Sequence, residues 1–447
     1  MYRTATALSV LMATGSLHAA DAVRHEATLE GHAILPARTL IAAPEDAPEA
    51  LQISGKFTSR GNPVRSTEEP TQGESMPLIG QPLQGFSGIR TVGDGSYHVL
   101  TDNGFGSRSN SPDAMLFFHQ VRPDFATGEV IVEKTTFLSD PNKVVPFVTT
   151  MEGSESRYLT GADLDIEGFQ MVGDDIVIGD EFGPYIIVAN AQTGIVSEFH
   201  ETYVDGELVK SPDHHSIQLP NPGAELPAYT AKRSRGFEGF AASVDGKTLY
   251  PLLEGALWQA DKNDWERLDD GRSALRILEM TAATREWTGN SWLYPLEDDS
   301  HAIGDFNMID ATRGLIIERD GGQGDAEMVC AENETEECFD NPAGFKRVYL
   351  IDMAGVEPGQ PVNKVAYIDL LDIRDPDGVA RQGQREDARF TFPFVTIENV
   401  DRVDETHIIV ANDNNFPFST GRTLGQPDDN EMILLEVGDF LRASVAN

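Results

Sequence analysis

Short β-rich runs alternate with polar turns along most of this chain. The run Ile176–Ile178 follows the turn Val172–Asp175, and Thr248–Tyr250 follows Val244–Lys247. A turn followed by such a run predicts a β-hairpin. The only segment with a helical period is Phe440–Val445, so the pattern predicts an all-β protein.

One unit recurs along the chain: a carboxylate-glycine turn, followed by a strand that ends in further acid or amide groups. It is clearest at Ile166–Gly168 with Gly179–Gly183, and at Phe237–Gly239 with Leu253–Gly255. The five units start at residues 87, 167, 238, 305 and 398. Because the first strand of an antiparallel hairpin starts where the second ends, both acidic groups of a unit lie at one rim.

Repetition of a hairpin at this spacing predicts the blades of a β-propeller. Each unit is longer than a bare blade, so we expect large loop insertions, at Thr58–Pro82, His200–Arg235, Asp325–Phe345 and Asp372–Arg389. Strand-like segments near both termini would complete a further blade. We therefore expect six blades, with five as the alternative, in one domain that spans residues 21–447.

Blades around one axis would bring the carboxylates of Glu167, Glu238, Asp305 and Glu398 to one mouth of the central channel. Such carboxylates repel one another unless a cation is present, and calcium is the hard ion that oxygen ligands favour. The second halves of the units add the candidate calcium ligands Glu318, Asp413 and Asn414. The alternative is that these acids only accept hydrogen bonds from backbone amides of neighbouring turns.

The same rim supplies candidate catalytic residues. The candidate acids at this rim are Glu167, Asp180, Glu181 and Glu238. Two arginines, Arg235 and Arg319, lie beside the motifs and could clamp a phosphate or bridge carboxylates. A structural ion pair of Arg319 with a neighbouring acid is the alternative.

Two other polar groups are less informative. The pair His214–His215 lies in a proline-flanked insertion, where neighbouring histidines are usually solvated. Ser87 occupies the slot that glutamate fills in the sister units, and no nucleophile motif surrounds it. We therefore interpret Ser87 as a turn residue.

The N-terminal segment suggests that the protein is exported. Residues 1–20 have a basic start, an apolar run and a small-residue end, which predicts a signal peptide, and no later run is long enough to span a membrane. We expect a periplasmic or extracellular protein, in which Cys330 and Cys338 form a local disulfide.

The charge limits the possible partners. The 73 Asp and Glu residues exceed the 34 Lys and Arg residues, and the net charge is −39. A field of that sign repels nucleic acid and anionic membranes, so we expect a monomer that acts on a small molecule.

Four groups of motifs resemble the phytase-like family named for esterase-like activity, a group of secreted bacterial β-propellers. They are Ile166–Phe169 with Gly179–Tyr185, Arg235–Phe240 with Asp245–Tyr250, Ile317–Gly324, and Pro393–Glu398 with Val410–Phe418. The resemblance implies calcium-assisted hydrolysis of a phosphate ester at the channel mouth. The acid-glycine signature is incomplete at Ser87, Asp305 and Asn399, so the ring departs from a symmetric pattern.

Three functions fit these observations: a calcium-dependent phosphoesterase, a propeller lactonase or carboxylesterase with one calcium, and a non-catalytic binding propeller with structural calcium. The acids at the rim suit both enzymes.

Overall fold

The computed structural model describes residues 22–58, 72–102, 104–217, 228–332 and 337–444. The signal peptide predicted at residues 1–20 lies outside these ranges. Within them, strands dominate and α1 (Gly438–Leu441) is a single short turn of α-helix, shorter than the predicted Phe440–Val445. The all-β prediction is confirmed. No helix in the described ranges combines the length and the hydropathy that crossing a membrane would need.

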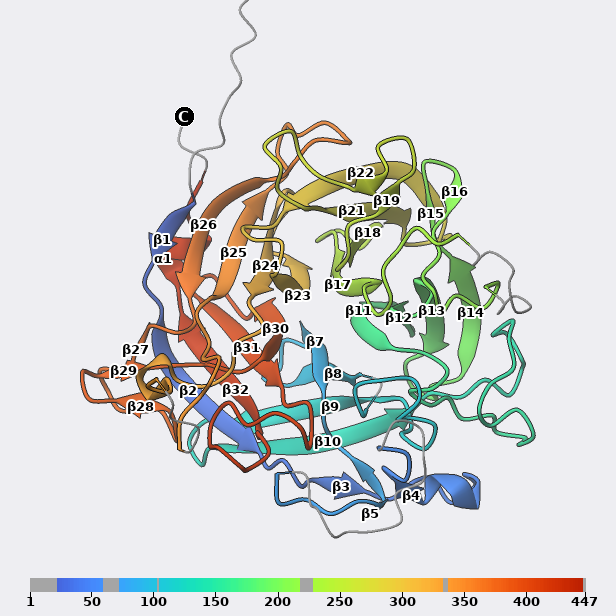
Figure 1. Ribbon diagram of the computed structural model, residues 1–447, viewed down its shortest axis with the longest axis horizontal. Coiled ribbons are helices and arrows are strands. Elements are labelled where there is room, and N and C mark those ends of the chain that lie inside the picture. The colour runs from blue at the N-terminus through green and yellow to red at the C-terminus, as the bar shows by residue number, and fades with distance from the viewer. Residues whose placement is uncertain (1–21, 59–71, 103, 218–227, 333–336, 445–447) are drawn as a thin grey trace, which may run out of the picture.

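The described residues form five blades of four antiparallel strands (Figure 1). The first contains β7 (Phe86–Thr91), β8 (Tyr97–Thr101), β9 (Phe117–Asp124) and β10 (Glu129–Phe137). The second contains β11 (Ile166–Val172), β12 (Asp175–Asp180), β13 (Tyr185–Asn190) and β14 (Val196–Glu201). The third contains β17 (Phe237–Ala242), β18 (Thr248–Leu253), β21 (Ala274–Thr281) and β22 (Trp287–Pro295).

The fourth blade contains β23 (Ala302–Met308), β24 (Arg313–Arg319), β25 (Lys346–Asp352) and β26 (Asn363–Asp369), and β1 (Val23–His25) adds to its edge in parallel. The fifth contains β30 (Thr396–Arg402), β31 (His407–Asp413), β32 (Asn430–Glu436) and, from the N-terminal region, β2 (Thr28–Leu35). The first strands β7, β11, β17, β23 and β30 contact one another in this order, and β30 contacts β7. The ring is therefore closed.

The expected count of six blades was wrong, and the alternative of five is correct for the described residues. The terminal segments do combine, because β2 pairs with β32 in antiparallel register from Thr28 opposite Glu436 to Leu35 opposite Asn430. This pairing completes the fifth repeat unit, which the motif at Glu398 had already counted. No additional blade results.

The apolar core lies between the blades. Along β12, the side chains of Ile176 and Ile178 pack with the first blade, while Val177 packs with Phe237 and Leu249 of the third. Successive residues of a strand face opposite sides, so a strand sandwiched between two blades is apolar throughout. This burial holds the second blade between its two neighbours.

The remaining strands are short pairs in the connections: β3 (Leu40–Ile41) with β6 (Gln81–Pro82), β4 (Ile53–Ser54) with β5 (Leu78–Ile79), β15 (Tyr203–Val204) with β16 (Glu207–Leu208), β19 (Trp258–Gln259) with β20 (Asp264–Trp265), and β29 (Arg389–Phe390) with both β27 (Ile373–Arg374) and β28 (Gln384–Arg385). β3 and β4 precede the first expected insertion, while the others lie in or at the end of an expected insertion or within the third blade. A disulfide joins Cys330 to Cys338 in one of these insertions, as predicted.

Candidate functional site

The first strand of every blade carries a β-bulge at the acid-glycine motif. In each blade the pairing between the first and second strands is regular up to the motif and then shifts. The shifts fall between Phe86 and Ile89, Ile166 and Phe169, Phe237 and Gly239, Ile303 and Phe306, and Ile397 and Asn399. A bulge redirects the side chain at its position, and such bulges are frequent next to active sites.

The first residue of each bulge defines what we call the first-strand ring. Its members are Ser87, Glu167, Glu238, Gly304 and Glu398. The ligand oxygens of Glu167, Glu238 and Glu398 all lie within 4.8 Å of one another, although they come from three blades. The hydroxyl of Ser87 donates a hydrogen bond of 2.9 Å to Glu398 Oε2.

A second set of five positions lies at the ends of the second strands. In each blade, the last residue of the first strand before the bulge pairs with a residue of the second strand. The residue that follows this partner in the sequence defines the second-strand ring. Its members are Asp102, Glu181, Glu254, Arg319 and Asp413. Oxygens of Glu181, Glu238 and Glu254 lie within 4.8 Å of one another, so the two rings meet.

Asp165, just before β11, joins the acids of the two rings. Its carboxylate lies within 4.8 Å of the ligand oxygens of Glu167 and Glu181. The backbone holds it there, because its N–H donates to Asp180 Oδ1 at 2.8 Å and its carbonyl accepts from Glu181 N at 2.8 Å.

Several of these carboxylates keep an oxygen without a protein partner. Glu167, Glu181, Glu238, Glu254 and Glu398 are only 6–7% exposed. Among the described residues, Glu167 Oε2, Glu181 Oε1 and Glu238 Oε1 are buried and have no hydrogen-bond partner. Because an unpaired buried charge is costly, such oxygens suit a bound cation or a retained proton. Anchors of neighbouring turns would have both oxygens occupied.

The electrostatics agree with this geometry. Burial, and then the neighbouring charges of Glu238 and Asp165, raise the pKa of Glu167 well above its ordinary value. Burial and the charge of Glu398 do the same to the pKa of Glu238. For Asp102, burial and then Asp165 raise the pKa to about 8. Without a cation, the raised pKa values favour the protonated forms of Glu167, Glu238 and Asp102 at neutral pH.

Burial and the nearby Glu254 raise the pKa of Glu181 well above its ordinary value. Burial and Glu398 raise the pKa of Asp413 in the same way, although Asp413 also accepts hydrogen bonds from Asn415 N at 2.6 Å and Thr396 Oγ1 at 3.1 Å. Both residues therefore belong electrostatically to the rings.

Two arginines are interspersed with the acids. Arg319 takes the acidic position of the fourth blade and donates to Glu398 Oε1 at 2.6 Å, while its own Nε is buried without a partner among the described residues. Arg235 pairs with Glu254 at 2.5 Å, and its side chain is 43% exposed. Arg235 can therefore also contact a molecule from solvent.

Asp305 does not join the first-strand ring, contrary to the sequence expectation. Gly304 occupies the ring position in the fourth blade, and Asp305 lies one residue later, at the place of Gly168 in the second blade. Asp305 Oδ2 accepts from the backbone N–H groups of Ile89 and Val400, each at 3.2 Å. This acid accepts hydrogen bonds from backbone amides, as in the alternative interpretation, but the amides belong to the first strands β7 and β30 and not to turns.

Three other predicted site residues also have structural partners. Asp180 accepts from the N–H groups of Asp165 and Gly183. Glu318 pairs with Lys364 at 2.7 Å and with His301 at 2.8 Å. Asn414 accepts from Gly85 N at 3.1 Å and donates to Asp428 O at 3.0 Å. The polar atoms of these side chains already have partners, so the side chains stabilise the rim but add no unpartnered oxygen to the site.

Sequence reasoning missed three acids of the site: Asp102, Asp165 and Glu254. Asp102 and Glu254 stand in the recurring motif one residue after the second strand, as Glu181 does, so the repeat contained their signal. Asp165 precedes its motif by two residues, and only the fold brings it to the rings.

Comparisons with known proteins give one family match and several structures of low similarity. The family model "Phytase-like", described as "Esterase-like activity of phytase", matches residues 81–416. A comparison with curated protein sequences finds no match. Among solved structures, the chain is similar to the Dos1 propeller with 9% identity and a TM-score of 0.30, over 81% of this chain and 71% of that chain.

A second similar structure is the PQQ-bound aldose sugar dehydrogenase of Streptomyces coelicolor, with 11% identity and a TM-score of 0.34 over 79% of this chain and 94% of that chain. Similarity at this level gives no information on activity. The family model is different, because it spans most of the residues that form the blades and both rings. The chain therefore belongs to the phytase-like family described by esterase-like activity of phytase.

Proposed function

We propose that this protein is an exported, calcium-dependent hydrolase of phosphoric esters whose reaction takes place at the two rings. The observation that carries the proposal is the set of buried, unpartnered oxygens of Glu167, Glu181 and Glu238, which belong to overlapping acid clusters of two neighbouring blades. Membership of the phytase-like family supports ester hydrolysis as the reaction class.

The residues present fit calcium. Glu167 and Glu238 would hold it through their unpartnered oxygens, because carboxylate oxygens are its preferred ligands. Glu398 lies within the same 4.8 Å and would share an oxygen that already accepts from Ser87 or Arg319, since a carboxylate oxygen has lone pairs for both. Bound there, calcium would offset the charge on phosphoryl oxygens and lower the pKa of a bound water.

The side chains of this chain divide the remaining tasks. Arg235, half exposed beside Glu254, would donate paired hydrogen bonds to phosphoryl oxygens and admit an anion to an acidic protein. Glu181 Oε1 would accept a proton from the attacking water. Arg319 would hold Glu398 in place, and Asp180 would position Glu181 through its hydrogen bonds to the surrounding backbone.

A panel of four substrates tests the proposal: nitrophenyl phosphate, bis-nitrophenyl phosphate, nitrophenyl acetate and a lactone, each with calcium and with chelator. We expect hydrolysis of a phosphate ester that requires calcium and that Glu181→Gln lowers by a factor of about 100 or more. Exposed Glu357→Gln, in a surface turn, is the matched control and should keep full activity.

The other outcomes identify the alternatives. Hydrolysis of the acetate or the lactone alone would replace the proposal by a propeller carboxylesterase or lactonase. Turnover of none of the four would leave a binding propeller with structural calcium.

A further inference from the structure

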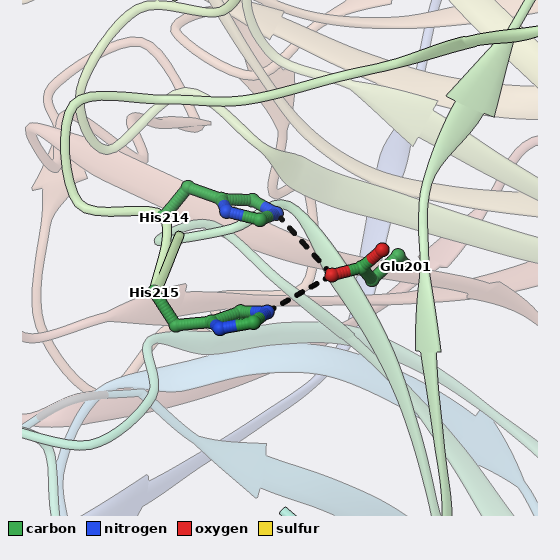
Figure 2. Close-up of side chains that lie close together, drawn as sticks. All are labelled: Glu201, His214 and His215. Atoms are coloured by element: carbon green, nitrogen blue, oxygen red, sulfur yellow. Dashed lines mark hydrogen bonds and ion pairs between the residues drawn. The ribbon is translucent and has the colours of Figure 1, made fainter. Parts of the chain in front are cut away.

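A second cluster of potential ligands lies on the same rim but at the outer edge of the second blade. Glu201 ends β14, the strand farthest from the axis in the sheet β11-β12-β13-β14. Three strand spacings separate β14 from β11, roughly 14 Å. The segment that follows, residues 211–217, folds back over this edge and places His214 and His215 opposite Glu201 (Figure 2).

Hydrogen bonds fix this segment. Ser211 N donates to Gly183 O at 2.9 Å, and His215 N donates to the hydroxyl of Tyr185 at 2.8 Å. The two imidazole rings stack with their centroids 4.8 Å apart, and both direct Nε2 toward Glu201 (Figure 2). The two histidines are thus built into the fold, in contrast to the solvated loop that the sequence suggested.

The three donor atoms are close enough to share one ion. His215 Nε2 lies 2.9 Å and His214 Nε2 lies 4.0 Å from Glu201 Oε1. Ligands of a tetrahedral zinc ion at the usual bond lengths are roughly 3.3 Å apart, so shifts of less than about 1 Å suffice. The hydroxyl of Tyr203 donates to the other oxygen, Glu201 Oε2, at 3.2 Å, so Glu201 Oε1 faces the two imidazole rings.

The only interaction of His214 Nε2 within the described part of the chain is the 4.0 Å approach to Glu201 Oε1. His214 is 1% exposed, and its Nε2 is buried without a hydrogen bond among the described residues. Its Nδ1 accepts from Ser216 N at 3.1 Å and lies 2.9 Å from Ser216 Oγ. If the single proton of the neutral ring moves from Nε2 to Nδ1, the hydrogen bond from Ser216 N is given up, Nδ1 donates to Ser216 Oγ instead, and the lone pair of Nε2 faces Glu201. Ligating histidines in metalloproteins usually donate their second nitrogen in this way.

We infer that Glu201, His214 and His215 form a binding site for a divalent transition metal such as zinc, separate from the two acid rings. Two imidazoles and one carboxylate favour zinc over calcium, which prefers oxygen ligands only. Three protein ligands leave a fourth position open in a tetrahedral site. Both histidines also line a cavity of about 410 Å³, whose wall includes Arg108, Arg233 and Phe182.

A titration with Co²⁺ and then Zn²⁺ tests the inference. The full exported protein, treated with chelator and then saturated with calcium to occupy the rings, should bind one Co²⁺ with the visible absorption of a tetrahedral site, and Zn²⁺ should displace it. His214→Ala and Glu201→Gln should each lower Zn²⁺ affinity at least about 100-fold. Ser216→Ala should lower it by about 10- to 100-fold through the lost partner of Nδ1.

His200→Ala is the matched control. His200 also lies on β14 and pairs with a glutamate, Glu198, at 2.7 Å, and no second histidine of the described ranges forms a metal-ligand group with them. This variant should bind Zn²⁺ as the wild type does. Absence of one-to-one binding in calcium-saturated wild type, or unchanged affinity in both Glu201→Gln and Ser216→Ala, would overturn the inference. Neither outcome depends on ester hydrolysis at the rings.

Discussion

Glu238 and Asp305 are both buried acids in the first strand of a blade, yet their oxygens have different partners. Glu238 Oε1 has none among the described residues, whereas both oxygens of Asp305 accept hydrogen bonds, including Phe306 N at 2.8 Å. A shift of one residue within the bulge produces the difference, because Gly304 takes the ring position of the fourth blade. Removal of charge should therefore have opposite consequences at the two sites.

At the residue scale, Glu238→Gln should change thermal stability with a sign that depends on calcium. It weakens calcium binding, so the melting temperature should fall below that of the wild type when calcium is present. Without calcium it relieves repulsion from Glu398 and Glu254, so the melting temperature should stay equal or rise. Asp305→Asn should lower the melting temperature in both conditions, since backbone amides lose a charged acceptor, a loss of about 1–3 kcal/mol. Equal small losses for Glu238→Gln in both conditions would make it a turn anchor.

At the scale of the element, the bulged first strands set the positions of the side chains in the rings. Gly168 follows Glu167 in the bulge of β11, and a β-carbon there would lie 2.6 Å from Glu238 O and 2.8 Å from Phe240 N of the next blade. The glycine therefore permits the close approach of β11 and β17 that brings the two glutamates together.

Gly168→Ala should destabilise the protein by roughly 1–3 kcal/mol, because the β-carbon forces two first strands apart. It should also weaken calcium binding, as the glutamates separate. Gly153→Ala is the control: a β-carbon there meets no atom within 4 Å, and stability should be unchanged or slightly higher. Urea unfolding measures the first effect and calorimetric titration the second. Equal stabilities of the two variants would contradict this account of the bulge.

The hairpins and their common rim could be predicted because turn, strand and motif are close together in the sequence. The blade count could not, since the pairing of β2 with β32 joins residues about 400 positions apart and competes with a separate sixth blade. Likewise, the local sequence around Gly304–Asp305 does not show where the bulge begins. That register decides whether Asp305 faces the centre or accepts hydrogen bonds from backbone amides.

At the scale of the whole molecule, the chain has a net charge of −39, and the two rings at the centre of the propeller are themselves acidic. The fourth blade departs most, because its ring positions, Gly304 and Arg319, replace two acids by no side chain and a cation, whereas the first blade replaces one acid by Ser87. The ring is therefore asymmetric, with its positive charge beside Glu398. This asymmetry leaves Glu167, Glu181 and Glu238 as the open side of the site.

The stability of calcium-free protein should fall as the pH rises from about 5 to about 8. Asp102, with its pKa raised to about 8 by burial and Asp165, binds its proton more tightly in the folded state than in the unfolded chain, where the pKa is about 3.9. The stability from this proton is complete below the unfolded pKa and is lost as the pH passes the folded one. Glu167 and Glu238, with raised pKa values, add the same sign. Melting temperatures in chelator should show this fall, and saturating calcium should reduce it; a rise with pH in chelator would contradict the assignment.

Calorimetric titration of calcium into chelator-treated protein tests the central claim, that carboxylates from different blades form one cation centre, most directly. The wild type should bind at least one calcium ion per chain. The triple variant Glu167→Gln, Glu238→Gln, Glu398→Gln should lose that binding, while a triple variant at exposed Glu155, Glu357 and Glu405 should retain it. Absence of calcium binding by the wild type, or equal binding by the two triple variants, would contradict the account.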